Sequence, residues 1–368
     1  MPVRQIGTTY SMTANTHPAY SRRAILETIS RLWAWLFLLG MVVFFSIAGN
    51  GFLTPFNLQA ILANMAILTI IALGQTYVII SGGIDLSVGW VMGMAAVISA
   101  TIMNSWPEST PMWLIVVSGL VVGLIAAWIA GLVNGVLIAR LNVPPFIATL
   151  GMFGIARGIG FLLSGGMPVP IYVKGLGFLG NGFLFYYHPT AGWSFLTPPA
   201  GLVQSDLRNM TGYFPFIVIV MLVMLLLAHI VLSRTTFGLH TYAIGGNKEA
   251  AMRAGIPVAR RTAAIYMLSA TFAAIAGLLY NVRFTNGAAN AGEAMLLDTV
   301  AAVVIGGASL FGGAGTVIGT LIGALIISVL ANGLVILRVN PFWQFIAVGI
   351  VIIIAVLIDQ AREKFAQE

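Results

Sequence analysis

Long apolar runs alternate with short polar segments from Leu32 to Ile358. An α-helix needs about 20 predominantly apolar residues to cross the hydrocarbon layer of a membrane, and several of these runs reach that length. The pattern therefore predicts an all-α, polytopic membrane protein. We expect ten membrane-spanning helices, at residues 32–48, 58–80, 90–103, 112–139, 146–163, 214–232, 262–282, 299–310, 316–337 and 342–358.

Composition excludes a soluble globular protein. Of the 368 residues 59% are hydrophobic and only 7% are charged, far from the balance of soluble domains. The chain contains no cysteine, which excludes disulfide and thiol chemistry. The net charge of +7 does not indicate nucleic-acid binding, because the basic residues are scattered between the apolar runs and report membrane orientation instead.

The distribution of Lys and Arg predicts the orientation. With the N-terminus in the cytoplasm, ten spans place twelve of the 17 basic residues on the inner side, as the positive-inside rule requires. The outer side then holds Lys174, Arg208, Arg283 and Arg338, and Arg157 falls within the fifth span. The predicted organisation is a cytoplasmic tail (1–31), a membrane domain (32–358) with an outer segment (164–213) and an inner loop (234–261), and a second cytoplasmic tail (359–368).

Two short segments predict an inverted repeat. NVPPFIATLG (142–151) enters the fifth span from the inside, and VNPFWQFIAVG (339–349) enters the tenth from the outside. Such a relation is common in transporters. A second resemblance, between SGGIDLSVG (81–89) and IGGASLFGG (305–313), does not fit the same pairing. Glycines also recur within the spans, where small faces let membrane helices approach closely; the fifth span carries Gly151, Gly154, Gly158 and Gly160.

The inner loop is the longest charged segment between two apolar runs. It carries five basic residues and a single acid, Glu249. Asn247 is a good helix N-cap, KEAAMRA (248–254) is a run of helix formers, and Gly255 followed by Pro257 ends the helix. So short a helix is not stable alone. Its small residues Ala250, Ala251 and Ala254 would admit a partner surface, although an ordinary solvated basic loop fits the same pattern.

Polar residues within the apolar runs are candidates for a transport pathway, because burying them in lipid is costly. Asp85, in SGGIDLSVG, is either part of a gate or the N-cap of the third span. The uncharged amides suit a pathway for a neutral polyol, and each suits interhelical hydrogen bonding equally well. These amides are Asn64, Gln75, Asn134, Asn281, Asn332 and Gln344.

No catalytic constellation is present in the sequence. The four histidines are dispersed, HExxH is absent, and no GxxxxGK[ST] phosphate-binding loop occurs. Any ATP chemistry must therefore come from another chain. The spans also lack the acid–base relays of proton-driven pumps.

Several motifs together resemble the permease subunit of bacterial ATP-binding-cassette (ABC) importers for monosaccharides, of the ribose type. They are GQTYVIISGGIDLSVG (74–89), NVPPFIATLGMFGIARG (142–158), FGLHTYAIGGNKEAAMRAGI (237–256), LDTVAAVVIGGASLFGGAGTVIGTLIGAL (297–325) and NPFWQ (340–344). The resemblance covers most of the chain. It implies that the inner loop carries the motif that couples import permeases to their ATPase, assigned here to Asn247, Glu249, Ala250, Ala251, Arg253 and Gly255.

The same resemblance implies the partners. It predicts a multi-pass protein of the bacterial inner membrane that is not itself an enzyme, carries no cofactor, and pairs with a second copy of itself or with a similar permease. A cytoplasmic ATPase would hold ATP and Mg, and a periplasmic binding protein would deliver the sugar or related polyol. Rival interpretations are a branched-chain amino acid permease of the ABC class, a stand-alone secondary transporter and a channel.

The outer segment departs from this family pattern. Residues 164–213 are longer and more aromatic than the resemblance leads us to expect, with Tyr186, Tyr187, Trp193 and Tyr213. The sequence is compatible with interfacial helices, with docking of the binding protein, or with a loop that has no binding role.

Overall fold

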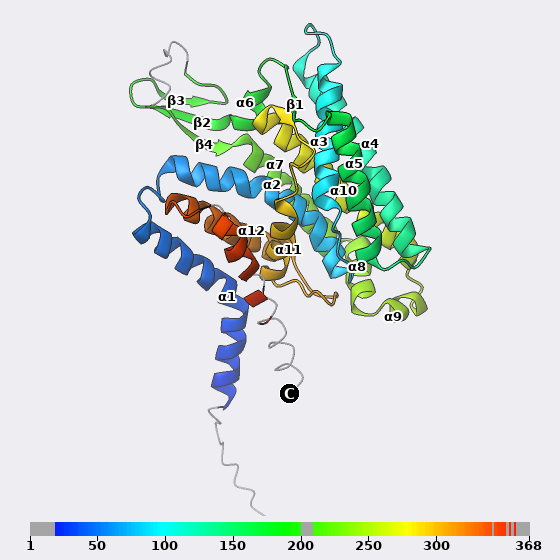
Figure 1. The fold of residues 1–368 in the computed structure, drawn as a ribbon. Helices are drawn as coiled ribbons and strands as arrows, with labels where there is room; N and C mark the ends of the chain where they lie inside the picture. The colour runs from blue at the N-terminus through cyan, green and yellow to red at the C-terminus, as the bar shows by residue number, and fades with distance from the viewer. Residues whose placement is uncertain (1–18, 200–208, 341, 351–352, 355–356, 358–368) are drawn as a thin grey trace, which may run out of the picture.

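The computed structural model describes residues 19–199, 209–340, 342–350, 353–354 and 357, with side chains described from Ala34 onward. The described chain is mainly helical, with two small sheets at one end (Figure 1). The helices are α1 Ala19–Ala48, α2 Pro55–Ile80, α3 Val88–Asn104, α4 Met112–Ala139, α5 Pro145–Ser164, α6 Leu176–Asn181, α7 Phe216–Arg234, α8 Thr236–Gly246, α9 Lys248–Arg253, α10 Val258–Phe284, α11 Met295–Ile305 and α12 Val317–Ile336. The strands are β1 Val169–Pro170, β2 Phe183–His188, β3 Gly192–Phe195, β4 Thr211–Pro215 and β5 Asn286–Gly287.

The helices agree with a polytopic membrane protein. Within the described residues, six helices are long and apolar enough to cross a membrane: α2, α4, α5, α7, α10 and α12. Three further apolar helical stretches are shorter, at 34–48, 88–104 and 295–305. These elements overlap the first nine predicted spans. The tenth, 342–358, is helical over 342–350 and otherwise lies partly outside the described residues, so the count of ten stays a prediction.

The first helix extends on the N-terminal side of the predicted first span. Helix α1 begins at Ala19, and its apolar stretch, 34–48, coincides with the span predicted at 32–48. The sequence RRAILETISRL (22–32) consists mostly of residues that favour a helix, so the apolar helix that follows extends backward through it. Residues 1–18 and the predicted C-terminal tail 359–368 lie outside the described residues.

Prolines fix where several helices begin. Pro55 and Pro145 are the first residues of α2 and α5, and Pro111 and Pro215 stand directly before α4 and α7. The first turn of a helix has no internal partner for its N–H groups, so proline is tolerated there and its fixed φ angle favours the helix. The polar breaks in the sequence therefore mark these boundaries closely.

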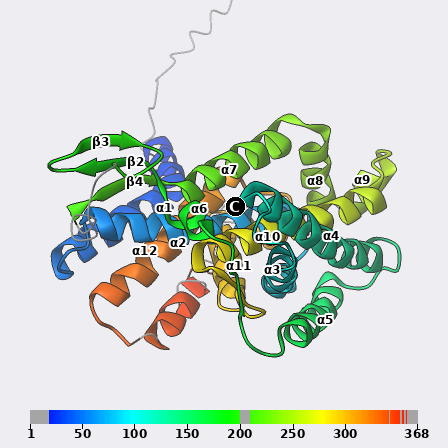
Figure 2. The ribbon, with the colours of Figure 1, turned by 90° about the horizontal axis from the view of Figure 1, so that it is seen from above.

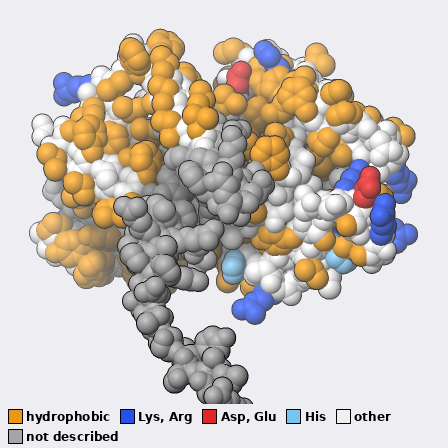
Figure 3. Space-filling view, turned by 90° about the horizontal axis from the view of Figure 1, so that it is seen from below, with side chains coloured by type: hydrophobic (Ala, Val, Ile, Leu, Met, Phe, Trp, Pro, Cys, Tyr) orange, Lys and Arg blue, Asp and Glu red, His pale blue; other side chains and the backbone are white. Residues whose placement is uncertain are grey.

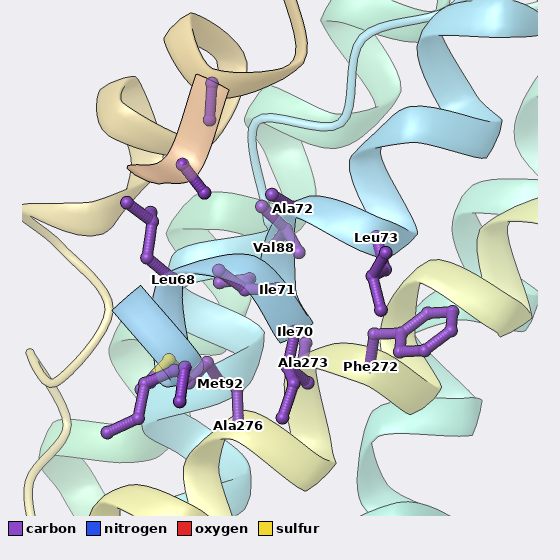
Figure 4. Close-up of a cluster of buried hydrophobic side chains, with 14 of the residues drawn as sticks. Leu68, Ile70, Ile71, Ala72, Leu73, Val88, Met92, Phe272, Ala273 and Ala276 are labelled. Carbon is purple, nitrogen blue, oxygen red and sulfur yellow. The ribbon is translucent and has the colours of Figure 1, made fainter. Parts of the chain in front are cut away.

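Helices α2 and α10 form the centre of the bundle. Figure 4 shows Leu73 of α2 close to Phe272 of α10, within a cluster of buried hydrophobic side chains to which α3 also contributes. Helix α4 packs on α10 through Gly131 and Gly135. An added Cβ at Gly131 would lie 2.7 Å from the Tyr266 carbonyl oxygen, and one at Gly135 would lie 2.6 Å from the Ala263 Cα. Small residues thus allow these two backbones to approach closely.

The outer segment adds β structure to a fold that was expected to be all-α. Strands β3, β2 and β4 form an antiparallel sheet in that order, and β1 pairs with β5. In its described residues, 164–199 and 209–213, the segment contains the short helix α6 between strands rather than a set of interfacial helices. Seen from the side and from above, the sheet lies at the opposite end of the molecule from α8 and α9 (Figures 1 and 2).

The outside of the bundle is apolar. Helix α4 exposes Trp113, Val117, Val121, Ile125 and Ile129, which recur every four residues along one face. Figure 3 shows hydrophobic side chains spread over the surface, while Lys and Arg gather at the edge where Figure 1 places α9. So large an exposed apolar surface fits contact with lipid.

Candidate functional site

Helices α8 and α9 form the connection between α7 and α10. The Asn247 side chain caps α9, with its Oδ1 accepting a hydrogen bond from the Ala250 N–H at 2.9 Å. Gly255 follows the helix with a φ angle of +80°, a left-handed conformation that favours glycine. The helix, its cap and its stop therefore form as the sequence predicts.

Helix α9 presents its polar side to solvent. Glu249 and Arg253 are exposed and stand one helical turn from each other, with 3.7 Å between the Glu249 Oε2 and the Arg253 Nη2. Ala250 and Gly255 are exposed as well. Ala251 is buried against Ile244 and Val258, which corrects the expectation that it faces a partner. It lies on the inner side of the helix and fixes α9 to its own chain.

Three loops meet backbone to backbone where α8 ends. An added Cβ at Gly245 would overlap the Ile80 carbonyl oxygen and lie 2.6 Å from the Gly313 nitrogen. The Gly313 N–H donates to that Ile80 oxygen at 2.8 Å. Gly312 lies equally close to Gly82 and Gly245, since its added Cβ would be 3.0 Å from either Cα. We call Gly82, Gly245, Gly312 and Gly313 the glycine junction.

The glycine junction connects α8 to both of the glycine-rich motifs. It includes residues from SGGIDLSVG, which joins α2 to α3, and from IGGASLFGG, which leads toward α12. The Tyr242 hydroxyl of α8 also donates to the Gly315 carbonyl at 2.7 Å. The two similar motifs are therefore spatial neighbours, and any displacement of α8 must move or break their contacts.

Asp85 is the centre of a buried polar network. Its Oδ1 accepts from the Ser87 N–H at 2.9 Å and from the Ser87 hydroxyl at 2.6 Å, and its Oδ2 accepts from the Ser269 hydroxyl at 3.0 Å. Asn134 donates to the Ser87 hydroxyl at 3.0 Å. The Gln75 amide bonds the Asp85 backbone when its nitrogen faces the carbonyl at 3.3 Å and its oxygen faces the N–H at 3.2 Å.

This network brings together three of the seven pathway candidates: Gln75, Asp85 and Asn134. Asp85 is not the N-cap of the third span, because that position is occupied by Ser87; the hydrogen bond from Ser269 ties Asp85 to α10 instead. Burial raises the pKa of the Asp85 carboxyl, and the hydrogen bonds from Ser87 and Ser269 offset part of that rise. The network joins the loop between α2 and α3 to α4 and α10.

A second group of candidates lines a cavity of about 300 Å³. Asn64 of α2, Asn332 of α12 and Gln344 contribute to its wall together with Asp298 and Ser328. The Asn332 Oδ1 is buried without a hydrogen-bond partner among the described residues. Asn64 accepts from the Arg283 guanidinium at 3.1 Å. We call this space the outer polar cavity.

Asp298 was not among the sequence candidates. It stands at the edge of the apolar run 299–310, and an acid at the start of such a run was the signal that could have identified it. Asn281 lies in neither group: its Nδ2 donates to the Ala96 carbonyl at 2.8 Å and joins α10 to α3. Its contact is that of an interhelical hydrogen bond.

Helix α5 leaves a glycine face uncovered. An added Cβ at Gly151, Gly154 or Gly158 would meet no atom within 4 Å. Arg157 is exposed beside them, and its guanidinium lies 5.0 Å from the centre of the Trp90 ring. A charge in the middle of an apolar helix is costly toward lipid, so this face fits a protein or aqueous environment better than hydrocarbon.

The family model described as "Branched-chain amino acid transport system / permease component" matches residues 57–356. The chain belongs to this family of transport permeases. It is 36% identical to the ribose import permease protein RbsC of Bacillus subtilis over 91% of this chain and 94% of the relative. It is also 36% identical to the fructose import permease protein FrcC of Rhizobium meliloti, over 89% and 84% of the two chains.

A third relative matches over nearly the whole of both chains. The galactose/methyl galactoside import permease protein MglC of Escherichia coli is 34% identical over 94% of this chain and 99% of the relative. No solved structure matches the chain.

Proposed function

We propose that this chain is the transmembrane permease subunit of an ABC importer that carries a monosaccharide or related polyol into the cytoplasm. One observation carries the proposal: an exposed, capped helix at one end of the bundle is joined through the glycine junction to the loops of the central helices. This arrangement suits a permease driven from outside its own chain. The relatives are import permeases for ribose, fructose and galactose, which supports a sugar as the substrate.

The outer polar cavity offers hydrogen-bonding partners to a polyol. Its polar wall contains amide, hydroxyl and carboxylate groups, from Asn64, Asn332, Gln344, Ser328 and Asp298. These groups donate to and accept from the hydroxyls of a sugar. The rest of the wall is apolar, from Leu68, Met295, Ile327, Ala331 and Val335, and can pack against the carbon skeleton of the substrate. We infer that the substrate passes this cavity.

The proposed topology has ten spans and both termini in the cytoplasm of a bacterial cell, with the chain in the inner membrane. Residues 234–261 are then the cytoplasmic coupling loop and 164–213 the periplasmic segment. The position of the sheet at the end opposite α9 supports this assignment. The similarity of NVPPFIATLG and VNPFWQFIAVG supports an inverted repeat.

The proposed partners follow from the exposed faces. A separate ATPase binds ATP and Mg and docks on α9. A second permease copy covers the glycine face of α5, where Gly151, Gly154 and Gly158 permit close packing and Arg157 finds polar surroundings. A periplasmic binding protein delivers the sugar. ATP binding displaces α8 and α9, and the glycine junction transmits the displacement to the α2–α3 and α11–α12 loops.

The coupling proposal is tested by Glu249→Arg combined with Gly255→Arg. Both positions are exposed, so the double variant will insert into the membrane normally but will lose ATPase association and ATP-driven uptake by at least about tenfold, equivalent to about 1.4 kcal/mol of binding. Pull-down of the ATPase by tagged permease measures the first effect, and labelled-sugar uptake by cells measures the second.

The chain offers a matched control at its other end. Glu108→Arg with Gly166→Arg reverses the same charge and places arginine at a glycine with nearly the same φ angle, +82° against +80°. Gly166, like Gly255, has open space around it. This control should retain ATPase association. Normal ATPase yield and uptake in the Glu249/Gly255 variant would rule out α9 as the docking element.

A further inference from the structure

The three-stranded sheet carries five aromatic side chains on one face. Phe185 and Tyr187 of β2 alternate with the buried Tyr186, and their partners across the sheet are Phe195, Trp193 and, on β4, Tyr213. The rings form two groups. Trp193 lies 5.0 Å from Tyr187 and 5.4 Å from Tyr213, and Phe185 lies 5.5 Å from Phe195, measured between ring centroids. We call this set the aromatic face.

The aromatic face is open to its surroundings. Trp193 is 65% exposed and Phe195 58% exposed, whereas Tyr186 on the opposite face is only 3% exposed. A cluster of large rings on one side of a small sheet is costly to leave in water. The face therefore needs a partner.

The chemistry of the face distinguishes between partners. Strands β2, β3 and β4 contain no Lys, Arg, Asp or Glu. Protein interfaces typically combine aromatic anchors with arginine and a polar rim. Trp and Tyr without charges are instead typical of the membrane–water interface, where the ring enters the apolar layer and the polar atom stays hydrated.

The position of the sheet continues the lipid-facing surface. The Gln59 side chain of α2 donates to the Gly212 carbonyl of β4 and so fixes the sheet to the beginning of α2. Beside this attachment, the corner between α1 and α2 exposes Ile47 by 83%, Leu53 by 58% and Phe56 by 81%. Figures 1 and 2 show the sheet next to the beginning of α2, at the margin of the bundle.

We propose that the aromatic face binds the headgroup layer of the membrane and holds the sheet as a lateral anchor at the outer ends of α1 and α2. The occupant is lipid, not a protein. The anchor fixes the outer end of α2, the helix whose other end reaches the glycine junction. This role is separate from sugar transport and does not depend on the identity of the substrate.

The absence of cysteine allows a direct test. Phe195→Cys, labelled with a nitroxide, is placed in the otherwise native chain and reconstituted in phosphatidylethanolamine–phosphatidylglycerol vesicles. Collisions with oxygen, which concentrates in lipid, and with a water-soluble nickel chelate are measured. Two matched labels set the scale: Glu108→Cys, exposed at the same end of the bundle, for water, and Ile47→Cys for lipid.

The proposal predicts that the Phe195 label collides with the nickel chelate several-fold less than the Glu108 label and behaves like the Ile47 label. A second label at Trp193 should agree, which guards against a local distortion at either site. Nickel accessibility equal to that at Glu108 would overturn the proposal. Protection that arises only when the cognate binding protein is added would also overturn it and assign the face to protein docking.

Discussion

Replacing Gly245 with alanine will uncouple the permease while leaving most of its helices intact. The new Cβ would overlap the Ile80 carbonyl oxygen and crowd the Gly313 nitrogen. Both obstacles are backbone atoms held by their own hydrogen bond, so neither can rotate away as a side chain can. Overpacking of this kind costs about 1–3 kcal/mol, and relief requires α8 to move away from the two loops.

We therefore expect ATP-driven sugar uptake to fall by about tenfold or more with Gly245→Ala. This fall corresponds to an overpacking free energy in the middle of the range of about 1–3 kcal/mol. ATPase association should persist, because the exposed side of α9 is unchanged. The matched control is Gly246→Ala, whose added Cβ meets no atom within 4 Å. Uptake close to that of the unmodified chain in both variants would show that the glycine junction does not transmit motion.

Replacing Asp85 with alanine will produce the second large effect. The carboxylate accepts three hydrogen bonds, from the Ser87 N–H, the Ser87 hydroxyl and the Ser269 hydroxyl. Hydrogen bonds to a charged group contribute about 1.5–3 kcal/mol each, and buried donors left unpaired add a penalty. Partial rearrangement will reduce the sum, so we expect the free energy of unfolding to fall by about 3 kcal/mol.

The conservative variant Asp85→Asn removes the negative charge but keeps a side chain that can form hydrogen bonds, so it distinguishes the two contributions. The Oδ1 of the substituted side chain can still accept from Ser87, and its amide nitrogen can donate to the Ser269 hydroxyl. The free energy of unfolding should therefore fall clearly less with Asp85→Asn than with Asp85→Ala. Thermal unfolding of purified permease in detergent measures both variants. Equal stability of Asp85→Ala, Asp85→Asn and the unmodified chain would contradict a structural role for this network.

Helix positions could be predicted because local signals decide them. Proline at the beginning of α2 and α5 and the Asn247 cap of α9 act within one helical turn, so the sequence displays them directly. Hydropathy predicted the apolar stretch of α1 but not the polar extension to Ala19, because hydropathy detects the membrane-spanning part of a helix. The sheet was missed because its strands are short and the connection between β3 and β4 is long.

The composition of the candidate sites depends on long-range contacts that spacing does not reveal. Asn64, Asp298, Asn332 and Gln344 belong to separate elements and meet only when α2, α11 and α12 pack. The glycine junction likewise joins residues about 230 positions apart in the chain. The need for glycine at position 245 follows from the backbone atoms of Ile80 and Gly313, which occupy the place of a Cβ. Ala251 faced inward for the same reason: the side to which a short helix packs is set by its neighbours.

We propose that the energy for transport enters the permease through α9 from a separate ATPase. The most direct measurement is uptake of labelled ribose, fructose, galactose and xylose by liposomes that contain the permease, its ATPase and its binding protein, with ATP on the side of the ATPase. We predict uptake that requires ATP and is lost with Glu249→Arg combined with Gly255→Arg. Gradient-driven uptake by the permease alone, without ATPase or ATP, would contradict the account.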